Sequence, residues 1–192
     1  MPNPAKAGDS SIRFQSGKAE SPHVLESGSI APYFSLPDQD GRVRTLAEVL
    51  QTGPLLLYFY PADFTPRSTR GACAIRDLHD GILGVGLRIF GISPQSSDSH
   101  QRFRAQHGLP FDLLSDVDKS VIRLYDVDGP LGFGVRRATY LLDPDGVIRD
   151  GVIADLRIAP HETFIRNALA VAERERHAGR LVAAPVGANS AQ

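Results

Sequence analysis

The residues best placed to do chemistry follow a short apolar run, in the segment from residue 60 to residue 73. Residues 55–60 are apolar or aromatic and lie between Gly53-Pro54 and Pro61, which predicts a short buried strand. Thr65 followed by Pro66 is typical of a helix start, because the threonine hydroxyl caps backbone N–H groups and proline suits the first helical position. Ser68 is therefore expected in the first turn of a helix that follows the strand.

The start of a helix suits an ionised nucleophile. A cysteine there, near arginine, has its pKa lowered from the usual value of about 8.5 and reacts as a thiolate. Position 68 instead carries a serine, whose hydroxyl stays protonated unless a base removes the proton. No Gly-x-Ser-x-Gly motif surrounds Ser68 and no histidine lies close by in the sequence, which argues against a serine nucleophile of the hydrolase type. We favour the other interpretation, that Ser68 helps to satisfy backbone groups in the first helical turn.

Several ordered motifs resemble those of the peroxiredoxins, most closely the bacterioferritin-comigratory or Q-type branch of this AhpC/TSA-like family. The signature of that branch is Pro-x-x-x-Thr-x-x-Cys after a strand. Pro61 and Thr65 match it, whereas Ser68 occupies the position of the peroxidatic cysteine. The similarity runs from about residue 28 to about residue 169, with matching segments at 36–41, 58–61, 72–77 and 137–143. It implies an α/β thioredoxin-like fold, with a mixed central sheet flanked by helices and an N-terminal hairpin extension.

The resemblance also implies a role for each matching residue. The Thr65 hydroxyl would orient the peroxide, Pro61 would shield the pocket, and position 68 would attack. Arg137, directly before Ala-Thr-Tyr, would polarise the nucleophile and the departing oxygen. Arginines usually lie at the surface; the match favours a functional role for Arg137, and we assign the neighbouring Arg136 to the solvated surface.

Cys73 is the only cysteine, and it matches the resolving position five residues after the peroxidatic one. The other interpretation is a small buried apolar residue. Five residues along a regular helix separate two Cα atoms by roughly 8.7 Å on nearly opposite faces, beyond the limit of roughly 7 Å for a disulfide. Resolution would therefore require the helix to unwind, and Gly71 lowers helix stability by about 1 kcal/mol relative to alanine. With one cysteine, an intramolecular disulfide is impossible.

Two flanking positions also depart from the commonest form of the motif, because Arg67 stands where a small residue is expected and Gly71 where an acid is expected. Deliberate inactivation usually changes one residue, whereas several departures together indicate natural drift toward a non-peroxidatic homologue. Peroxiredoxins vary at these flanking positions, so the sequence leaves both origins of Ser68 open.

Composition predicts one domain with two tails. Residues 1–25 are polar and rich in Ser, Gly and Pro, which predicts a disordered arm; residues 26–177 form the domain, and residues 178–192 a flexible tail. Strands and helices alternate between them. The expected strands are 55–60, 87–92, 111–114, 138–142 and 147–152, and the expected helices are 66–81, 98–107, 119–125 and 160–176.

The charge is balanced, at −1 from 21 basic and 22 acidic residues, and gives no case for binding nucleic acid or an anionic membrane. No apolar run approaches the roughly 20 residues that span a bilayer. The N-terminus lacks the apolar core of a secretory signal, so a cytoplasmic protein is expected.

No cofactor is implied. We predict no metal site, because His100, His107 and Asp112 are too loosely spaced, and residues 129–134 lack the Lys-Ser/Thr ending of a phosphate-binding loop.

Two functions are consistent with the sequence. The first, implied by the resemblance, is a thioredoxin-dependent peroxidase that reduces hydrogen peroxide and small alkyl hydroperoxides, present here in a Ser68 form expected to be inactive or nearly so. The second is a non-catalytic module that keeps the fold and the pocket but binds a protein partner. Q-type relatives are often monomers, which implies a monomer or a weak dimer.

Overall fold

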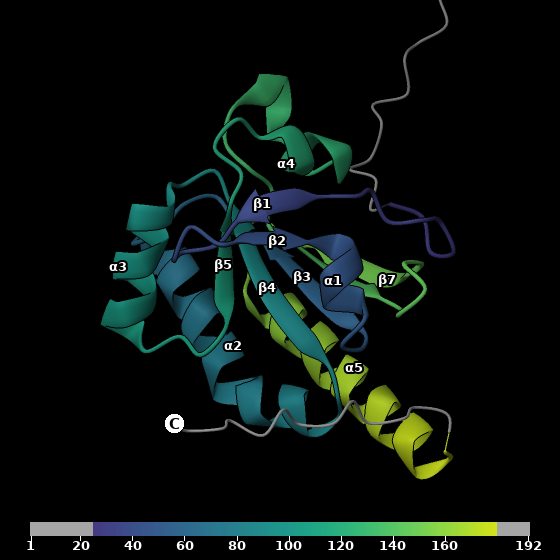
Figure 1. Cartoon of the computed structure of the whole chain (residues 1–192). Coiled ribbons are helices and arrows are strands. Elements are labelled where there is room, and N and C mark those ends of the chain that lie inside the picture. Colours follow the sequence, from purple (N-terminus) through teal and green to yellow (C-terminus); the bar gives the residue numbers. More distant parts are fainter. Residues whose placement is uncertain (1–24, 180–192) are drawn as a thin grey trace, which may run out of the picture.

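A mixed five-stranded sheet forms the centre of the computed structural model, which describes residues 25–179 (Figure 1). The strand order is β5-β4-β3-β6-β7. Strands β3, β4 and β5 run parallel, whereas β6 is antiparallel to β3 and β7 is antiparallel to β6. The strands are β3 (Leu55–Phe59), β4 (Arg88–Ser93), β5 (Asp112–Ser115), β6 (Ala138–Leu142) and β7 (Ile148–Ile153). The mixed sheet predicted from the sequence is confirmed.

The N-terminal hairpin is also present, as β1 (Ser35–Pro37) paired antiparallel with β2 (Val43–Thr45). A short helix that we did not predict, α1 (Leu46–Leu50), follows it directly. Its start is a capping box in which Glu48 N–H donates to the Thr45 hydroxyl and Thr45 N–H donates to the Glu48 carboxylate, both at 3.3 Å. The Thr-x-x-Glu pattern that signals such a start was present in the sequence.

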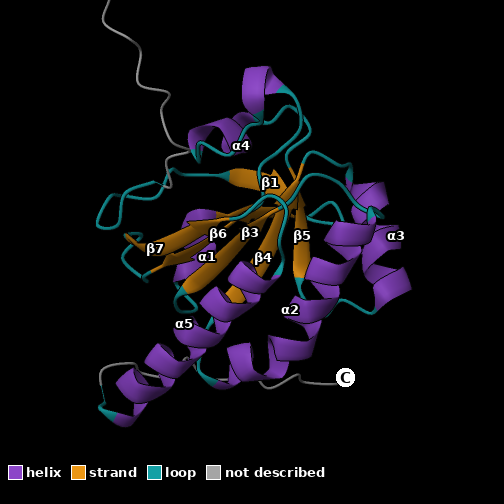
Figure 2. Ribbon diagram, turned by 180° about the vertical axis from the view of Figure 1, so that it is seen from behind, coloured by secondary structure: helices purple, strands orange, loops and turns teal. Residues whose placement is uncertain are grey.

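Helices cover both faces of the sheet. On one face, α2 (Pro66–Gly84) and α5 (Ala159–His177) lie side by side and face the viewer in Figure 2. Helix α3 (Ser97–His107) packs beside β5 and adds Phe103 to the same apolar core. The other face is covered by the N-terminal hairpin, α1 and α4 (Ser120–Leu124).

Strand β3 explains why the first apolar run is unbroken. Leu55, Leu57 and Phe59 belong to the core under α1 and α4, whereas Leu56 and Tyr58 belong to the core under α2, α3 and α5. Side chains alternate along a strand, so a strand covered on both faces is apolar at every position. The same alternation directs Tyr58 and, one step after the strand, Tyr60 to the α2 side.

Most predicted boundaries differ from the structure by one residue, and the end of α2 differs by three. Helix α2 continues past Gly81 because that glycine lies against α5, where an added Cβ would meet Leu169 at 3.6 Å, an ordinary contact distance. Strand β5 begins one residue later than predicted, in register with Phe90–Ser93. Residues 130–132, for which we predicted no element, form a 3-10 turn, and the Lys119 ammonium donates to the carbonyls of Gly132 and Gly134, both at 2.8 Å. The predicted arm and tail lie outside the described residues, apart from their inner ends.

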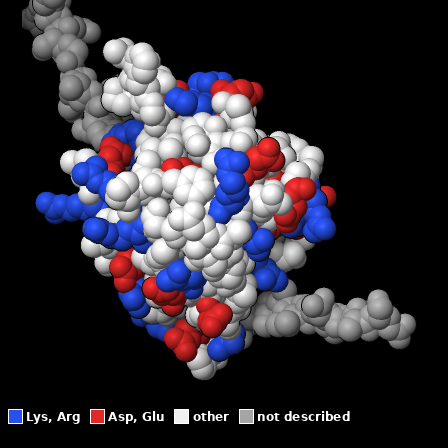
Figure 3. All heavy atoms as spheres, turned by 90° about the vertical axis from the view of Figure 1, so that its left-hand side faces the viewer, with Lys and Arg blue, Asp and Glu red and all other residues white. Residues whose placement is uncertain are grey.

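No helix within residues 25–179 is long and apolar enough to cross a membrane. On the face shown in Figure 3, basic and acidic side chains are intermixed.

Candidate active site

The loop between β3 and α2 carries the first predicted site residues. Thr65 is the N-cap of α2, and its hydroxyl accepts a hydrogen bond from Ser68 N–H at 3.3 Å. Pro66 takes the first helical position. Pro61 is half-buried at the other end of this loop, directly after the sheet. The helix start predicted from Thr-Pro is confirmed, and it places Ser68 in the first turn, where backbone N–H groups carry partial positive charge.

Ser68 and Arg137 meet in the interior. Ser68 is fully buried and Arg137 is 2% exposed. The Nη2 of Arg137 donates to Ser68 Oγ at 3.5 Å. Sheet register explains the approach, since Ala138 pairs with Phe59 and Arg137 therefore lies where β3 ends and the loop begins. The structure thus brings together the residues that match the family's nucleophile and arginine. The Ser68 hydroxyl accepts a hydrogen bond from Arg137, so our interpretation that it satisfies backbone groups of the first helical turn was wrong.

Tyr58 is a site residue that the sequence did not reveal. Arg137 Nη1 donates to the Tyr58 hydroxyl, and the guanidinium carbon lies 5.8 Å from the centre of the ring. Burial raises the pKa of Tyr58, despite the opposing effect of Arg137, so the phenol remains neutral. Among the described residues, Arg137 Nε has no hydrogen-bond partner. The buried guanidinium therefore donates to two neutral hydroxyls and to no carboxylate.

A buried cation without an anion is unfavourable. A thiolate at position 68 would place a negative charge beside Arg137, where the serine offers only a hydroxyl oxygen. The surroundings of position 68 thus favour a negatively charged side chain, whereas this chain has a neutral serine there.

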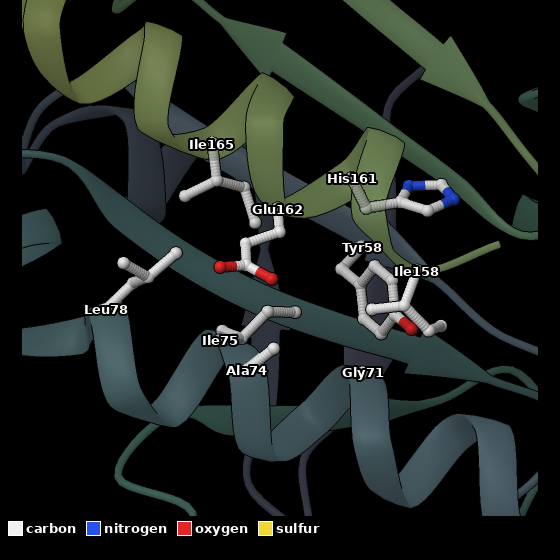
Figure 4. A pocket seen from close by; sticks show the side chains of 9 residues that line it. All are labelled: Tyr58, Gly71, Ala74, Ile75, Leu78, Ile158, His161, Glu162 and Ile165. Atoms are coloured by element: carbon white, nitrogen blue, oxygen red, sulfur yellow. The ribbon is translucent and has the colours of Figure 1, made fainter.

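Gly71 lies beneath the tip of the Tyr58 ring (Figure 4). Any Cβ at position 71 would collide with the Tyr58 hydroxyl. Beside them, a cavity of about 10 Å³, enough for about one water molecule, lies between α2 and α5. Gly71 therefore has a packing role in addition to its effect on helix stability. The cavity is lined by Tyr58, Gly71, Ala74, Ile75, Leu78, Ile158, His161, Glu162 and Ile165.

His161 holds the start of α5 above Tyr58 (Figure 4). Its Nε2 lies 3.0 Å from the Ala154 carbonyl and must donate, so its Nδ1, 2.9 Å from Thr139 Oγ1, accepts from that hydroxyl. Burial lowers the pKa of His161, and the charge of Arg137 adds to this, although the bond to Ala154 opposes it. The ring is therefore neutral and packs edge-on to Tyr58 at 5.9 Å.

Among the neighbouring arginines, Arg136 differs from our prediction of a solvated surface residue. Arg136 is not simply solvated, because it forms an ion pair with Asp155 at 2.9 Å, and the second oxygen of Asp155 accepts from Arg137 N–H, also at 2.9 Å. Asp155 therefore fixes the backbone that carries Arg137. Arg67 and Arg70 are exposed, so the arginine that contacts position 68 is Arg137.

Cys73 is half-buried on α2, and the helix is continuous from position 68 to position 73. A disulfide between positions 68 and 73 would therefore require α2 to unwind, as we predicted from the sequence. No cluster of three or more metal-binding side chains occurs in the described part of the chain.

Comparison with known proteins agrees with this geometry. The model of the AhpC/TSA family matches residues 27–150. The chain belongs to the AhpC/TSA family. Within it, the similarity is to the Q-type peroxiredoxins: 38% identity over 149 residues to peroxiredoxin Bcp of Escherichia coli, covering 74% of this chain and 94% of that protein. Identity to the chloroplastic peroxiredoxin Q of Oryza sativa subsp. japonica is 42% over 127 residues, covering 65% of this chain and only 58% of the plant protein.

Solved peroxiredoxins share the fold. Peroxidoxin BcpB from Mycobacterium tuberculosis superposes with a TM-score of 0.70 at 32% identity, covering 77% of this chain and 96% of that one. Peroxiredoxin Q from Xanthomonas campestris gives a TM-score of 0.66 at 30% identity, covering 72% and 90%. The predicted thioredoxin-like fold is confirmed.

Proposed function

We propose that this chain carries the framework of a thiol peroxidase, with hydroperoxides as substrates and a thioredoxin-like dithiol as reductant. Ser68 leaves it inactive or nearly so. The observation that carries the proposal is the contact of buried Arg137 with position 68 at the start of α2. Hydrogen peroxide and small alkyl hydroperoxides are the proposed substrates, and a cytoplasmic monomer or weak dimer is the proposed state.

The chemistry follows from a cysteine at position 68. Its thiolate attacks one peroxide oxygen, the O–O bond breaks, and the other oxygen leaves with the electron pair and takes a proton to become water or an alcohol. Sulfur is oxidised to a sulfenic acid. Arg137 and the helix N-terminus stabilise the negative charge that passes from sulfur to the leaving oxygen, and the Thr65 hydroxyl orients the peroxide.

Cys73 would complete the cycle. After α2 unwinds locally, its thiol displaces the hydroxyl from the sulfenic acid, which releases water and forms a disulfide that an external dithiol reduces. Ser68 cannot begin this sequence, because a serine hydroxyl remains protonated near neutral pH and its oxygen is not oxidised by peroxide.

Ser68 itself favours the second candidate, a non-catalytic binding module. Gly71, where the family expects an acid, is a second departure on the same face of α2, and both leave the fold intact. Such a protein would keep the buried frame and use its surface for a partner.

Peroxide consumption with thioredoxin and thioredoxin reductase distinguishes the two candidates. We expect turnover for Ser68→Cys and none above background for the parent chain. The double variant Ser68→Cys, Cys73→Ser is the matched control, and it should react once with peroxide but lose thioredoxin-dependent turnover. Absence of turnover and of the first oxidation in every form would reject the peroxidase framework and favour the binding module.

A further inference from the structure

Asp63 is a buried carboxylate in the middle of the active-site loop, two residues before Thr65. Its side chain is fully buried. The hydroxyl of Tyr60 donates to it at 2.8 Å and that of Ser99 at 2.7 Å. The Nδ1 of His100 lies 2.9 Å from the same carboxylate. Asp63 therefore ties the loop to α3, an element far from it in sequence.

The contacts of His100 define its charge. Nε2 lies 3.2 Å from the Leu114 carbonyl, which can only accept, and 3.5 Å from the Ser93 hydroxyl, which can also accept, so donation from Nε2 suits both oxygens. Nδ1 faces Asp63, which already accepts the single hydroxyl protons of Tyr60 and Ser99, so Nδ1 must also donate. With both nitrogens donating, Asp63 and His100 form an ion pair whose side chains are both fully buried.

The charge state of Asp63 agrees with this pairing. Burial alone would raise the pKa of Asp63, but the hydrogen bond and charge of His100, with the bonds from Ser99 and Tyr60, outweigh burial and lower it. The titratable groups in hydrogen-bonding contact with His100 are Asp63 and Tyr60, and burial and Asp63 raise the pKa of Tyr60 so that it stays neutral.

The same α3 surface also holds the next residue of the loop. Phe64 has a left-handed backbone with φ 58°, a conformation that bulky residues rarely adopt. Its ring packs edge-on against Phe103 of α3 at 5.2 Å. Asp63 and Phe64 thus attach to α3 one after the other, and the chain then turns into Thr65.

We propose that the Asp63–His100 ion pair is a positioning device for the active site. It holds residues 61–65 in the shape that keeps the Thr65 hydroxyl on Ser68 N–H and directs position 68 toward Arg137. Neither Asp63 nor His100 is hydrogen-bonded to Ser68, so both act through the loop. The consequence for peroxide reduction rests on the proposed function, whereas the consequence for loop geometry does not.

Asp63→Asn and His100→Asn test the proposal, with Asp116→Asn as the matched control. Asp116 is also fully buried and accepts three bonds, from Ser120 Oγ at 3.1 Å, Val121 N–H at 3.3 Å and Ile122 N–H at 2.7 Å. These partners lie in the first turn of α4 and not in the active-site loop. If Asp63→Asn does not fold, Ser99→Ala and Tyr60→Phe remove single bonds to the same carboxylate.

The first measurement is amide hydrogen exchange by NMR in the Ser68 chain itself. We expect the Ser68 amide to exchange at least about tenfold faster in Asp63→Asn and His100→Asn, relative to the Leu57 amide in the centre of the sheet, which corrects for global destabilisation. Asp116→Asn should leave that ratio unchanged. Imidazole ¹⁵N shifts should show both nitrogens of His100 protonated in the parent at neutral pH. An unchanged ratio in the loop variants, or a His100 ring with one proton, would overturn the proposal.

The second measurement places the same substitutions in the Ser68→Cys background. We expect the rate of thiol oxidation by hydrogen peroxide to fall by about 10- to 100-fold in the two loop variants, because small misplacements of reacting groups have effects of this size. Asp116→Asn should retain the rate. If Ser68→Cys itself does not react, the proposed function fails, and the exchange ratio still decides whether the ion pair positions the loop. Equal rates in all four proteins would overturn the positioning role.

Discussion

Arg137 is the residue around which the site is organised. It is buried, its backbone is fixed by Asp155, and its guanidinium contacts the Tyr58 hydroxyl and Ser68 Oγ. The resemblance to the family's motifs predicted Arg137, Thr65 and position 68 as site residues, and the structure places Thr65 and Arg137 in contact with Ser68. Tyr58 was not located, because a tyrosine inside an apolar run is indistinguishable from an ordinary core residue until the neighbouring strand places an arginine against it.

Gly71 gives a prediction at this scale. Alanine normally stabilises a helix relative to glycine, but we expect Gly71→Ala to lower the free energy of unfolding by about 1–3 kcal/mol, because its Cβ collides with the buried Tyr58 hydroxyl. Urea unfolding measures the effect. Gly81→Ala in the same helix is the control, and it should stabilise by about 0.5–1 kcal/mol because only an ordinary contact is made. Adding Tyr58→Phe should reduce the loss of unfolding free energy caused by Gly71→Ala, because the hydroxyl that collides with the Cβ is removed. Equal effects of alanine at positions 71 and 81 would show that the Tyr58 hydroxyl does not lie against position 71.

At the scale of elements, two buried histidines help to attach helices of the α2 side to the rest of the fold. His100 joins α3 to the loop after β3 through Asp63, and the neutral His161 joins α5 to β6 and the Ala154 carbonyl. Their partners differ, because a carboxylate faces His100 and a threonine hydroxyl faces His161. The sequence predicted the helices that carry these residues, but their partners come from strands and loops that only the tertiary structure brings near.

The neutral state of His161 predicts a pH dependence of stability. Its pKa is lowered in the folded protein by burial, whereas in the unfolded chain it is close to 6.5. Below about pH 6.5 the unfolded chain therefore binds more protons, and the stability that neutral His161 contributes is lost as the pH falls toward the folded-state pKa. Urea unfolding at several pH values should show the parent more stable than His161→Gln at pH 7.5, with the difference shrinking toward pH 5. A difference that grows as the pH falls would mean that the ring is charged in the folded state.

At the scale of the whole molecule, the sheet and its main helices were predictable because hydrophobic period, Gly-Pro boundaries and capping signals agree along most of the chain. Residues 46–50 were missed although their capping box was visible, because five residues carry too little periodicity to indicate a helix. The end of α2 was placed too early because glycine lowers helix propensity, and the packing of Gly81 against α5 overrides that preference. The fold as a whole is that of a peroxiredoxin, and the departure from the signature of the Q-type branch at the nucleophile position lies at one buried side chain, Ser68.

The most direct test of this account compares two chains with one cysteine each, the parent with Cys73 and the double variant Ser68→Cys, Cys73→Ser. Each is treated with one equivalent of hydrogen peroxide in the presence of a sulfenic-acid trap, and the labelled position and its rate are followed by mass spectrometry. We predict labelling at position 68 of the variant at least about tenfold faster than at Cys73 of the parent, because only position 68 combines the helix N-terminus with Arg137. Equal rates in the two chains would contradict the claim that position 68 is the peroxide-reactive centre of this fold.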